Sequence, residues 1–373
     1  MNKITKIIIG IIVIALVVIV WLNMSSNKFV GNTIKIGVLT PLTGSVAEYG
    51  NNVKQGILLA TKEINNANGI NGKKIELFFE DSKCDSTEAV NSFNKLVNID
   101  GAGIILGTVC SSETLAIAPL ANEKKVIVVS AAASSPQITN AGDYIFRVYP
   151  SDDYEAGVAA STIFSKFQKN KVSVLYLNND YGVALRDAFR KKFTALGGKI
   201  LNEEGYVQGA TDFRTQLLKV KDQKPDVIYM ISYPVDGGLA IKQAKQLVIK
   251  AIYFGTSGLK GNDFISNGGI STEGFVLASP IESSSTKTDT FTKNYETEFG
   301  VKPGIASDRA YDSVYVIKAA FIEAKNITDI KNNLYKINQF DGASGGISFD
   351  SNGDLANIKY SLFDIKNSKF VKY

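Results

Sequence analysis

The stretch "GAGIILGTVCSSETLAIAPLANEKKVIVVSAA", residues 101–132, decides the fold. Two short apolar runs, "GAGIILG" and "VIVVSAA", flank a segment that we interpret as a helix, "SETLAIAPLANEKK". Apolar runs without alternation are typical of strands buried on both faces. Strands that alternate with helices belong to a parallel sheet with helices on its two sides. The stretch therefore predicts one strand–helix–strand unit of such a sheet.

The same alternation continues in both directions from this unit. Before it, strands are expected at residues 34–39 and 73–81, with helices at 45–69 and 86–100. After it, a second series has strands at 171–180, 199–206, 226–233 and 251–257, and helices at 153–167, 182–198, 212–223, 237–247 and 306–324. Strand-like segments at 346–350 and 359–373 close the chain. We expect an α/β fold with two doubly wound parallel-sheet lobes.

The two lobes have no long flexible linker between them. The extended segments "FRVYPSDD" (146–153) and "EGFVLASPIESS" (273–284) are the best crossovers. Several crossings without a linker predict a hinge, with a cleft between the lobes. We place the first lobe at residues 34–149 plus 282–352 and the second at 150–281 plus 353–373.

Composition excludes several classes of function. The chain has 373 residues, 45% hydrophobic and 21% charged, with a net charge of +5. Basic residues are interspersed with acidic ones, so we expect no nucleic-acid partner. There is no histidine, which excludes Ser-His-Asp and Cys-His catalysis and most zinc sites. We expect a protein that is not an enzyme and that holds neither a cofactor nor a metal.

Residues 1–28 form an export signal. The basic start "MNKITK" precedes "IIIGIIVIALVVIVWL", and polar residues follow. No small-x-small cleavage site is evident, and no cysteine follows that would carry a lipid. We favour an uncleaved helical anchor in the membrane, with an ordinary cleaved signal as the alternative. Either reading places the remainder outside the cytoplasm, in the periplasm or at the cell surface.

An oxidising exterior bears on the two cysteines, Cys84 and Cys110. Each follows a predicted strand, and we expect the two to form a disulfide. Two free thiols in the core, or a metal site without histidine, are the alternatives.

The strand-end loops are where an open α/β sheet binds ligands. Here these loops are small, hydroxylic or aromatic, as in "TPLTGSVAEYG", "GTVCSSE", "SAAASSPQ", "LNNDYG", "ISYPVDGG" and "GTSGLKG". They contain no Gly-x-Gly-x-x-Gly fingerprint, Walker loop or Gly-x-Ser-x-Gly elbow. The cleft is therefore expected to bind something other than a nucleotide phosphate.

Several motifs together resemble the leucine/isoleucine/valine periplasmic binding proteins, which feed ABC importers. They are "IKIGVLTPLTGSVAEYG", "NGINGKKIELFFEDSKCDSTEAV", "GTVCSSET", "VSAAASSPQITN", "LNNDYGVAL" and "AYDSVY". The resemblance runs from about residue 34 to the C-terminus. It implies the type I periplasmic-binding fold, a multi-crossing hinge and an ABC permease in the membrane as partner.

The resemblance also implies a ligand seat on the first lobe. Ser111 resembles the family's carboxylate-binding serine, at the start of a helix whose free N–H groups favour an anion. Helix capping alone is the alternative role for Ser111. Ala132 and Ser134 resemble the positions that offer backbone groups and a hydroxyl to an amino acid's charged ends. Tyr49 resembles an aromatic residue of the first-lobe wall.

On the second lobe, Tyr181 and Tyr233 resemble the aromatic residues that close over the ligand. One position departs from the family. Ser257 stands where amino-acid binders place the acid that pairs with the ligand's ammonium, and an unpaired buried ammonium is costly. Asp236 is our first candidate to replace that acid; the others are Asp180, Glu113 and Asp312.

These observations leave the ligand open among an amino acid, an amide and a small carboxylate. The first hypothesis for function is solute capture for an ABC importer. The second is a membrane-tethered sensor built on the same module. The third, an extracellular α/β hydrolase, is opposed by the missing histidine and nucleophile elbow.

Overall fold

The computed structural model describes residues 32–356 and 358–373. The predicted N-terminal signal or anchor lies outside the described residues. Within the described ranges, no helix is both long enough and apolar enough to cross a membrane.

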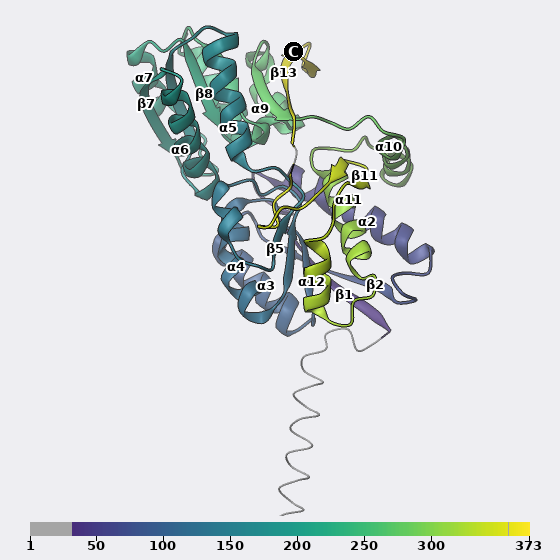
Figure 1. Ribbon diagram of the computed structural model, residues 1–373. Helices are drawn as coiled ribbons and strands as arrows, with labels where there is room; N and C mark the ends of the chain where they lie inside the picture. Colours follow the sequence, from purple (N-terminus) through teal and green to yellow (C-terminus); the bar gives the residue numbers. More distant parts are fainter. Residues whose placement is uncertain (1–31, 357) are drawn as a thin grey trace, which may run out of the picture.

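The first lobe is built on a five-stranded parallel sheet in the order β2-β1-β3-β4-β5. Its strands are β1 (Thr33–Thr40), β2 (Lys74–Asp81), β3 (Ile104–Gly107), β4 (Ile127–Ser130) and β5 (Ile145–Arg147). Its helices are α2 (Ala47–Asn66), α3 (Ser86–Asn98), α4 (Ser111–Lys124), α11 (Ser307–Ala320) and α12 (Ile327–Leu334). Figure 1 shows α3 and α4 on one side of this sheet and α11 and α12 on the other.

The strand residues explain why both faces are covered. Successive side chains on a strand point to opposite faces. Ile105 packs in one buried cluster with Phe93 of α3, whereas the next residue, Leu106, belongs to the cluster that includes Val53 of α2. The apolar run at 101–107 therefore contains a strand buried from both sides, as predicted.

The second lobe is built on a seven-stranded sheet in the order β14-β13-β10-β9-β8-β6-β7. Its strands are β6 (Lys171–Leu177), β7 (Lys199–Tyr206), β8 (Val227–Ile231), β9 (Ile252–Gly255), β10 (Val276–Pro280), β13 (Tyr360–Lys366) and β14 (Lys369–Lys372). Its helices are α5 (Asp152–Ser161), α6 (Asp180–Ala195), α7 (Arg214–Gln223), α8 (Pro234–Gln246) and α9 (Asn262–Gly268). The strands β6–β10 are parallel, while β13 pairs antiparallel with both β10 and β14.

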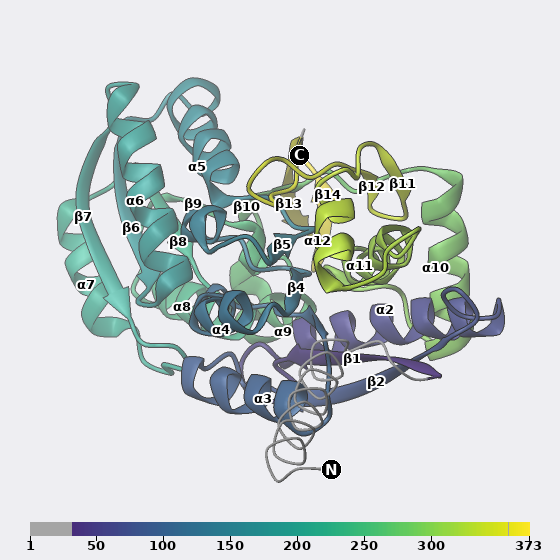
Figure 2. The ribbon, with the colours of Figure 1, turned by 60° about the horizontal axis from the view of Figure 1, so that its bottom comes forward.

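The chain passes between the lobes three times within the described residues, at about residues 148–151, 281–285 and 348–359. These segments lie side by side: the Arg147 N–H donates to the Gly353 carbonyl at 3.1 Å, and the Ile281 N–H donates to the Lys359 carbonyl at 2.9 Å. Figure 2 shows the two lobes side by side, with α6, α7 and α8 in one and α2, α11 and α12 in the other. The predicted fold class is confirmed; the residue bounds of each lobe stay a prediction.

Some elements differ from the sequence prediction. Helix α10 (Thr286–Phe299) was not expected, although its start has a capping box of Ser285 and Thr288 and its end has Gly300 at φ 72°. These are ordinary helix boundary signals. The strand expected at 346–350 is shorter: β12 (Gly345–Ile347) pairs with β11 (Phe340–Gly342), and Phe349 forms an isolated bridge with Leu355.

Candidate functional site

A disulfide joins Cys84 and Cys110, with their Cα atoms 5.5 Å apart. This confirms the predicted pair. Cys110 is the N-cap residue of α4, and its backbone N–H donates to the buried Glu113 carboxylate at 2.8 Å. The disulfide and this contact together fix the turn that presents the following residue, Ser111.

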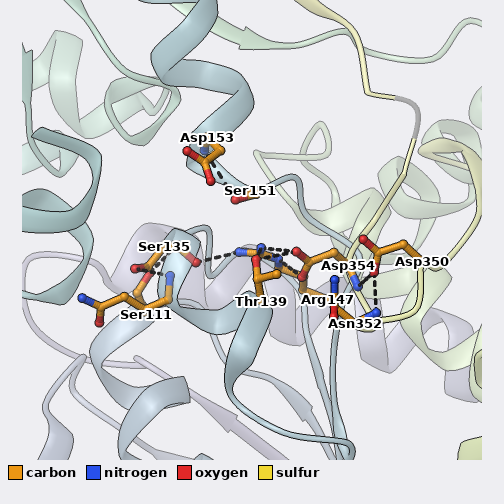
Figure 3. Close-up of polar contacts among 10 residues, drawn as sticks. Ser111, Ser135, Thr139, Arg147, Ser151, Asp153, Asp350, Asn352 and Asp354 are labelled. Carbon is orange, nitrogen blue, oxygen red and sulfur yellow. Dashed lines mark hydrogen bonds and ion pairs between the residues drawn. The ribbon is translucent and has the colours of Figure 1, made fainter. Parts of the chain in front are cut away.

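Ser111 begins α4 and is 1% exposed. Its Oγ accepts a hydrogen bond from the Ser135 N–H at 3.1 Å, so it holds the loop that follows β4 (Figure 3). That loop also carries Ala132 and Ser134, and the Ala132 N–H donates to the Thr108 carbonyl at 3.4 Å. Ser111, Ala132 and Ser134, three of the four first-lobe residues predicted from the resemblance, therefore lie on adjoining strand-end segments.

A buried arginine ties this loop to the hinge, as Figure 3 shows. Arg147 donates from Nη1 to the Ser135 carbonyl at 2.8 Å. Its Nε and Nη2 donate to the two carboxylate oxygens of Asp354 at 2.7 and 2.6 Å. Asp354 belongs to the third crossing segment, so the position of the Ser135 loop depends on the hinge.

The three predicted tyrosines are buried, and Tyr49 contacts the opposite lobe. Tyr181 of α6 and Tyr233, the N-cap residue of α8, stack with ring centroids 5.3 Å apart and an interplanar angle of 9°. The Tyr181 hydroxyl donates to Thr256 Oγ1 at 2.8 Å. Tyr49 comes from α2 on the first lobe, and its hydroxyl donates to the Ser257 carbonyl at 3.1 Å. Burial raises the pKa of all three tyrosines, so they remain hydrogen-bond donors.

The lobes touch through further direct contacts. The Ser135 hydroxyl donates to the Asp180 carbonyl at 3.2 Å. The Glu48 carboxylate of α2 accepts from the N–H groups of Asn262 and Asp263, at 2.8 and 3.0 Å, at the start of α9. The structure therefore has the two lobes closed on one another.

Ser257 has an unexpected partner. The carboxylate of Glu155, on α5, accepts from the Ser257 N–H at 2.7 Å and from the Ser257 hydroxyl at 2.6 Å. Glu155 is completely buried. Burial, and then the nearby Asp152, raise the pKa of Glu155 well above its ordinary value, although the Ser257 bonds oppose this. A carboxylate from another helix thus reaches the position where an acid was expected.

A second buried carboxylate lies beside the first. Asp152 begins α5, and its Oδ2 accepts from the Ser134 hydroxyl at 3.0 Å. Its Oδ1 is buried and has no hydrogen-bond partner among the described residues. Burial raises the pKa of Asp152 to about 7, against a lowering by the Ser134 bond. Neither acid stands out in the sequence, because acidic residues in the first turn after Ser151 are typical of any helix start.

Of the acids that the sequence singled out, Asp180 precedes Tyr181, and Glu113 accepts from the Cys110 N–H, whereas Asp236 and Asp312 have other partners. Asp236, in the first turn of α8, accepts from the Gly209 N–H at 3.0 Å, and burial raises its pKa to about 6. Asp312 accepts from Ala343 and Ser344, at 2.8 and 2.7 Å from their N–H groups. No hydrogen bond among the described residues joins either acid to Ser257 or to the tyrosine pair. Their proposed pairing with an ammonium stays a prediction.

A cavity of about 380 Å³ lies beside the second crossing segment, at Ile281 and Glu282. Its lining includes Glu48, Tyr149, Lys260 and Arg309. Tyr149 connects it to the buried acids, since the negative charge of Glu155 contributes to a raised pKa of this tyrosine after the effect of burial. Arg309 lies 5.2 Å from the centroid of the Tyr149 ring. The described residues contain no group of three or more His, Cys, Asp or Glu that could hold a metal ion.

Comparison with known proteins agrees with this architecture. The sequence profile of the family described as "Periplasmic binding protein" matches residues 33–369. The leucine-, isoleucine-, valine-, threonine-, and alanine-binding protein of Pseudomonas aeruginosa is 30% identical over 346 residues, 92% of each chain. The leucine-binding protein LivK of Thermotoga maritima has a TM-score of 0.85 at 28% identity, covering 91% of this chain and 98% of its own.

A second solved structure is bound to a ligand. The branched-chain amino acid transporter substrate-binding protein LivJ of Streptococcus pneumoniae, in complex with isoleucine, has a TM-score of 0.84 at 29% identity. The match covers 91% of this chain and all of that one. The profile match and the full-length relatives show that this chain belongs to the periplasmic binding protein family.

Proposed function

We propose that this protein captures a small aliphatic amino acid between its lobes and delivers it to an ABC importer. The observation that carries the proposal is that loops and helix starts following strands of both sheets meet, through the Tyr49–Ser257 and Ser135–Asp180 hydrogen bonds. Ligands of open α/β sheets bind at such ends. The Pseudomonas aeruginosa and Streptococcus pneumoniae relatives, named for branched-chain and small amino acids, support this ligand class.

The first lobe supplies groups suited to a carboxylate. Ser111 stands at the first turn of α4, where helix N–H groups lack partners within the helix and attract an anion. Ala132 and Ser134 border the same loop, and the small Ala132 side chain lets a ligand approach the backbone. We assign the ligand's carboxylate to this side.

The second lobe supplies an aromatic wall. The stacked Tyr181 and Tyr233 rings are 3% and 6% exposed in the closed form, so a ligand beside them loses contact with water. An aliphatic side chain against these rings gains about 25 cal/mol for each Å² of apolar surface removed from water. This favours a ligand with a branched or short aliphatic side chain over a strongly polar one.

The protein acts by binding, without turnover of its ligand. The chain has no histidine, and the family consists of binding proteins. For residues 1–28 we keep the sequence-based proposal of an uncleaved membrane anchor, with a cleaved signal as the alternative; a tethered sensor is the second candidate function that an anchor would suit.

A thermal-shift screen tests the proposal. The ligands are L-leucine, L-isoleucine, L-valine, L-threonine and L-alanine, with amides and short carboxylates as comparison classes. Binding stabilises the folded state by RT ln(1 + [L]/Kd), about 2.7 kcal/mol at a hundredfold excess over Kd. Stabilisation by amides or carboxylates but by none of the amino acids would refute the assignment of the ligand class.

A further inference from the structure

The ammonium end of an amino acid needs a negatively charged partner, and the buried carboxylates of α5 are the candidates. Asp152 and Glu155 are three residues apart, so they lie on the same face of the helix. Both are completely buried. Neither takes part in a salt bridge within residues 32–356 and 358–373, and the nearby Arg147 pairs with Asp354. Two adjacent carboxylates are thus enclosed without a counter-ion.

The cations of the neighbourhood are engaged elsewhere. Arg147 uses Nε and Nη2 on Asp354 and Nη1 on the Ser135 carbonyl. Arg309 donates from Nη1 to the Val148 carbonyl at 2.8 Å. The positive charge of Arg147 still lowers the pKa of Asp152, but neither arginine donates a hydrogen bond to Asp152 or Glu155. Enclosing an acid in this way is costly unless a cation or a proton joins it.

Unpartnered polar atoms point to a missing group at the same place. Asp152 Oδ1 and the hydroxyls of Tyr229 and Tyr360 are buried and lack hydrogen-bond partners among the described residues. Both tyrosines lie close enough to Glu155 for its charge to raise their pKa, after the effect of burial. Buried polar groups in native proteins are nearly always paired, so this set of atoms is suited to a bound ligand.

We propose that Asp152 and Glu155 together bind the ammonium group of the ligand, with Glu155 as the main charged partner. The inference rests on the proposed function, since it requires a ligand with an ammonium. It explains Ser257: the residue at the family's acid position donates both its N–H and its hydroxyl to Glu155 and so positions that carboxylate. The proposed partner of the ammonium therefore lies in the first turn of α5 and not in the loop after β9.

The loop after β4 sets the two ends of the ligand next to one another. The Ser135 N–H contacts Ser111, in the carboxylate seat, and the hydroxyl of the preceding residue, Ser134, contacts Asp152. Adjacent residues therefore connect the anion-binding helix start to the acid pair. An α-amino acid carries its carboxylate and ammonium on one carbon, and here one loop contacts both a seat for the carboxylate and the acid pair.

Calorimetric titration of the wild type and four variants tests the proposal. The probes are L-leucine and its des-amino analogue, 4-methylpentanoate. Glu155→Gln keeps the shape of the side chain and removes its charge, and Asp152→Asn does the same at the second acid. Asp153→Asn is the matched control, since Asp153 lies in the same helical turn but is exposed. Asp236→Asn tests the rival acid.

We expect Glu155→Gln to weaken L-leucine binding about 10- to 100-fold, because a hydrogen-bonded charge partner is lost. Asp152→Asn should weaken it less, and Asp153→Asn should leave it unchanged. Binding of 4-methylpentanoate should be weak in the wild type and not weakened further by Glu155→Gln. The double variant Glu155→Gln with Ser257→Glu returns an acid to the site and should recover most of the lost L-leucine affinity.

Several results would overturn the proposal. If Glu155→Gln binds L-leucine as tightly as the wild type does, the ammonium lies elsewhere. The same follows if only Asp236→Asn loses affinity for L-leucine. Equal wild-type affinity for L-leucine and 4-methylpentanoate would exclude ammonium recognition, and this comparison needs no variant to fold. If wild-type protein binds none of the amino acids in the thermal screen, the proposed function itself fails, which is a distinct outcome.

Discussion

Removing the disulfide should lower the stability of the first lobe by an amount that the structure allows us to estimate. The bond joins residues 26 positions apart. Closing a loop of that length lowers the entropy of the unfolded chain by about 12 cal/mol/K, which is about 3.5 kcal/mol at room temperature. The change is Cys84→Ala with Cys110→Ala, which leaves no free thiol. Both cysteines are buried, and alanine introduces no polar atom there.

Urea unfolding followed by circular dichroism measures the difference. The double variant should unfold with a free energy about 3.5 kcal/mol lower than the oxidised wild type. Adding dithiothreitol to the wild type should reproduce most of the loss, and the same reductant should leave the double variant unchanged. A loss below about 1 kcal/mol, against the expected 3.5, would refute the loop-entropy reasoning for this bond.

Three other changes have defined outcomes. Asp354→Ala leaves the Arg147 guanidinium buried without its counter-ion, so urea unfolding should show a loss of about 3–5 kcal/mol, and a loss under 1 would contradict this. The pKa of Asp236 is about 6 in the folded protein and about 3.9 in the unfolded chain, so the folded state holds more protons between these values and stability falls as pH rises from about 4 to about 6. Melting temperatures of Asp236→Asn should fall less steeply across that range than those of the wild type, because Asp152 and other buried acids with a raised pKa remain; a slope equal to that of the wild type would show that Asp236 is ionised throughout. Ser111→Ala should weaken L-leucine binding by about 1–3 kcal/mol if the hydroxyl meets the ligand's carboxylate, whereas unchanged affinity would reduce Ser111 to holding the Ser135 loop.

Much of the fold could be predicted because its signals are local. An apolar run without alternation identifies a strand buried on both faces, and β3 and β4 follow that rule. Helix α10 was missed even though its boundary residues are informative, because its interior is mostly polar: only Phe291 and Tyr295 are buried. A helix that packs along one narrow edge has little hydrophobic periodicity to detect.

The site residues likewise differ in whether local sequence signals reveal them. Residues fixed by a strand end, such as Ser111 and Tyr233, could be located from the sequence because the end of a strand determines where they lie. Glu155 could not be located in this way. Its direction is set by how α5 packs on α6 and by the hinge segment before it, neither of which is written in the local sequence. The acidic turn at 152–155 has an ordinary explanation as a helix start, and only the contact with Ser257 distinguishes it.

The buried carboxylates also bear on how the two lobes close. The Ser257 carbonyl accepts a hydrogen bond from the Tyr49 hydroxyl of the first lobe, and the Ser257 hydroxyl donates to Glu155. One residue therefore takes part in both the contact between the lobes and the proposed ammonium seat. Each hydrogen bond between the lobes is worth about 1 kcal/mol, whereas enclosing two carboxylates without a cation opposes closure. A ligand shifts the lobes toward the closed form only by its difference in affinity for the two forms. An ammonium supplies that difference in affinity, because it offsets the cost of enclosing the two carboxylates, and that cost arises when the lobes close. L-leucine at saturation should therefore reduce the radius of gyration measured by X-ray scattering, and 4-methylpentanoate at saturation should reduce it less. The same reduction with both ligands would mean that the carboxylate end alone drives closure.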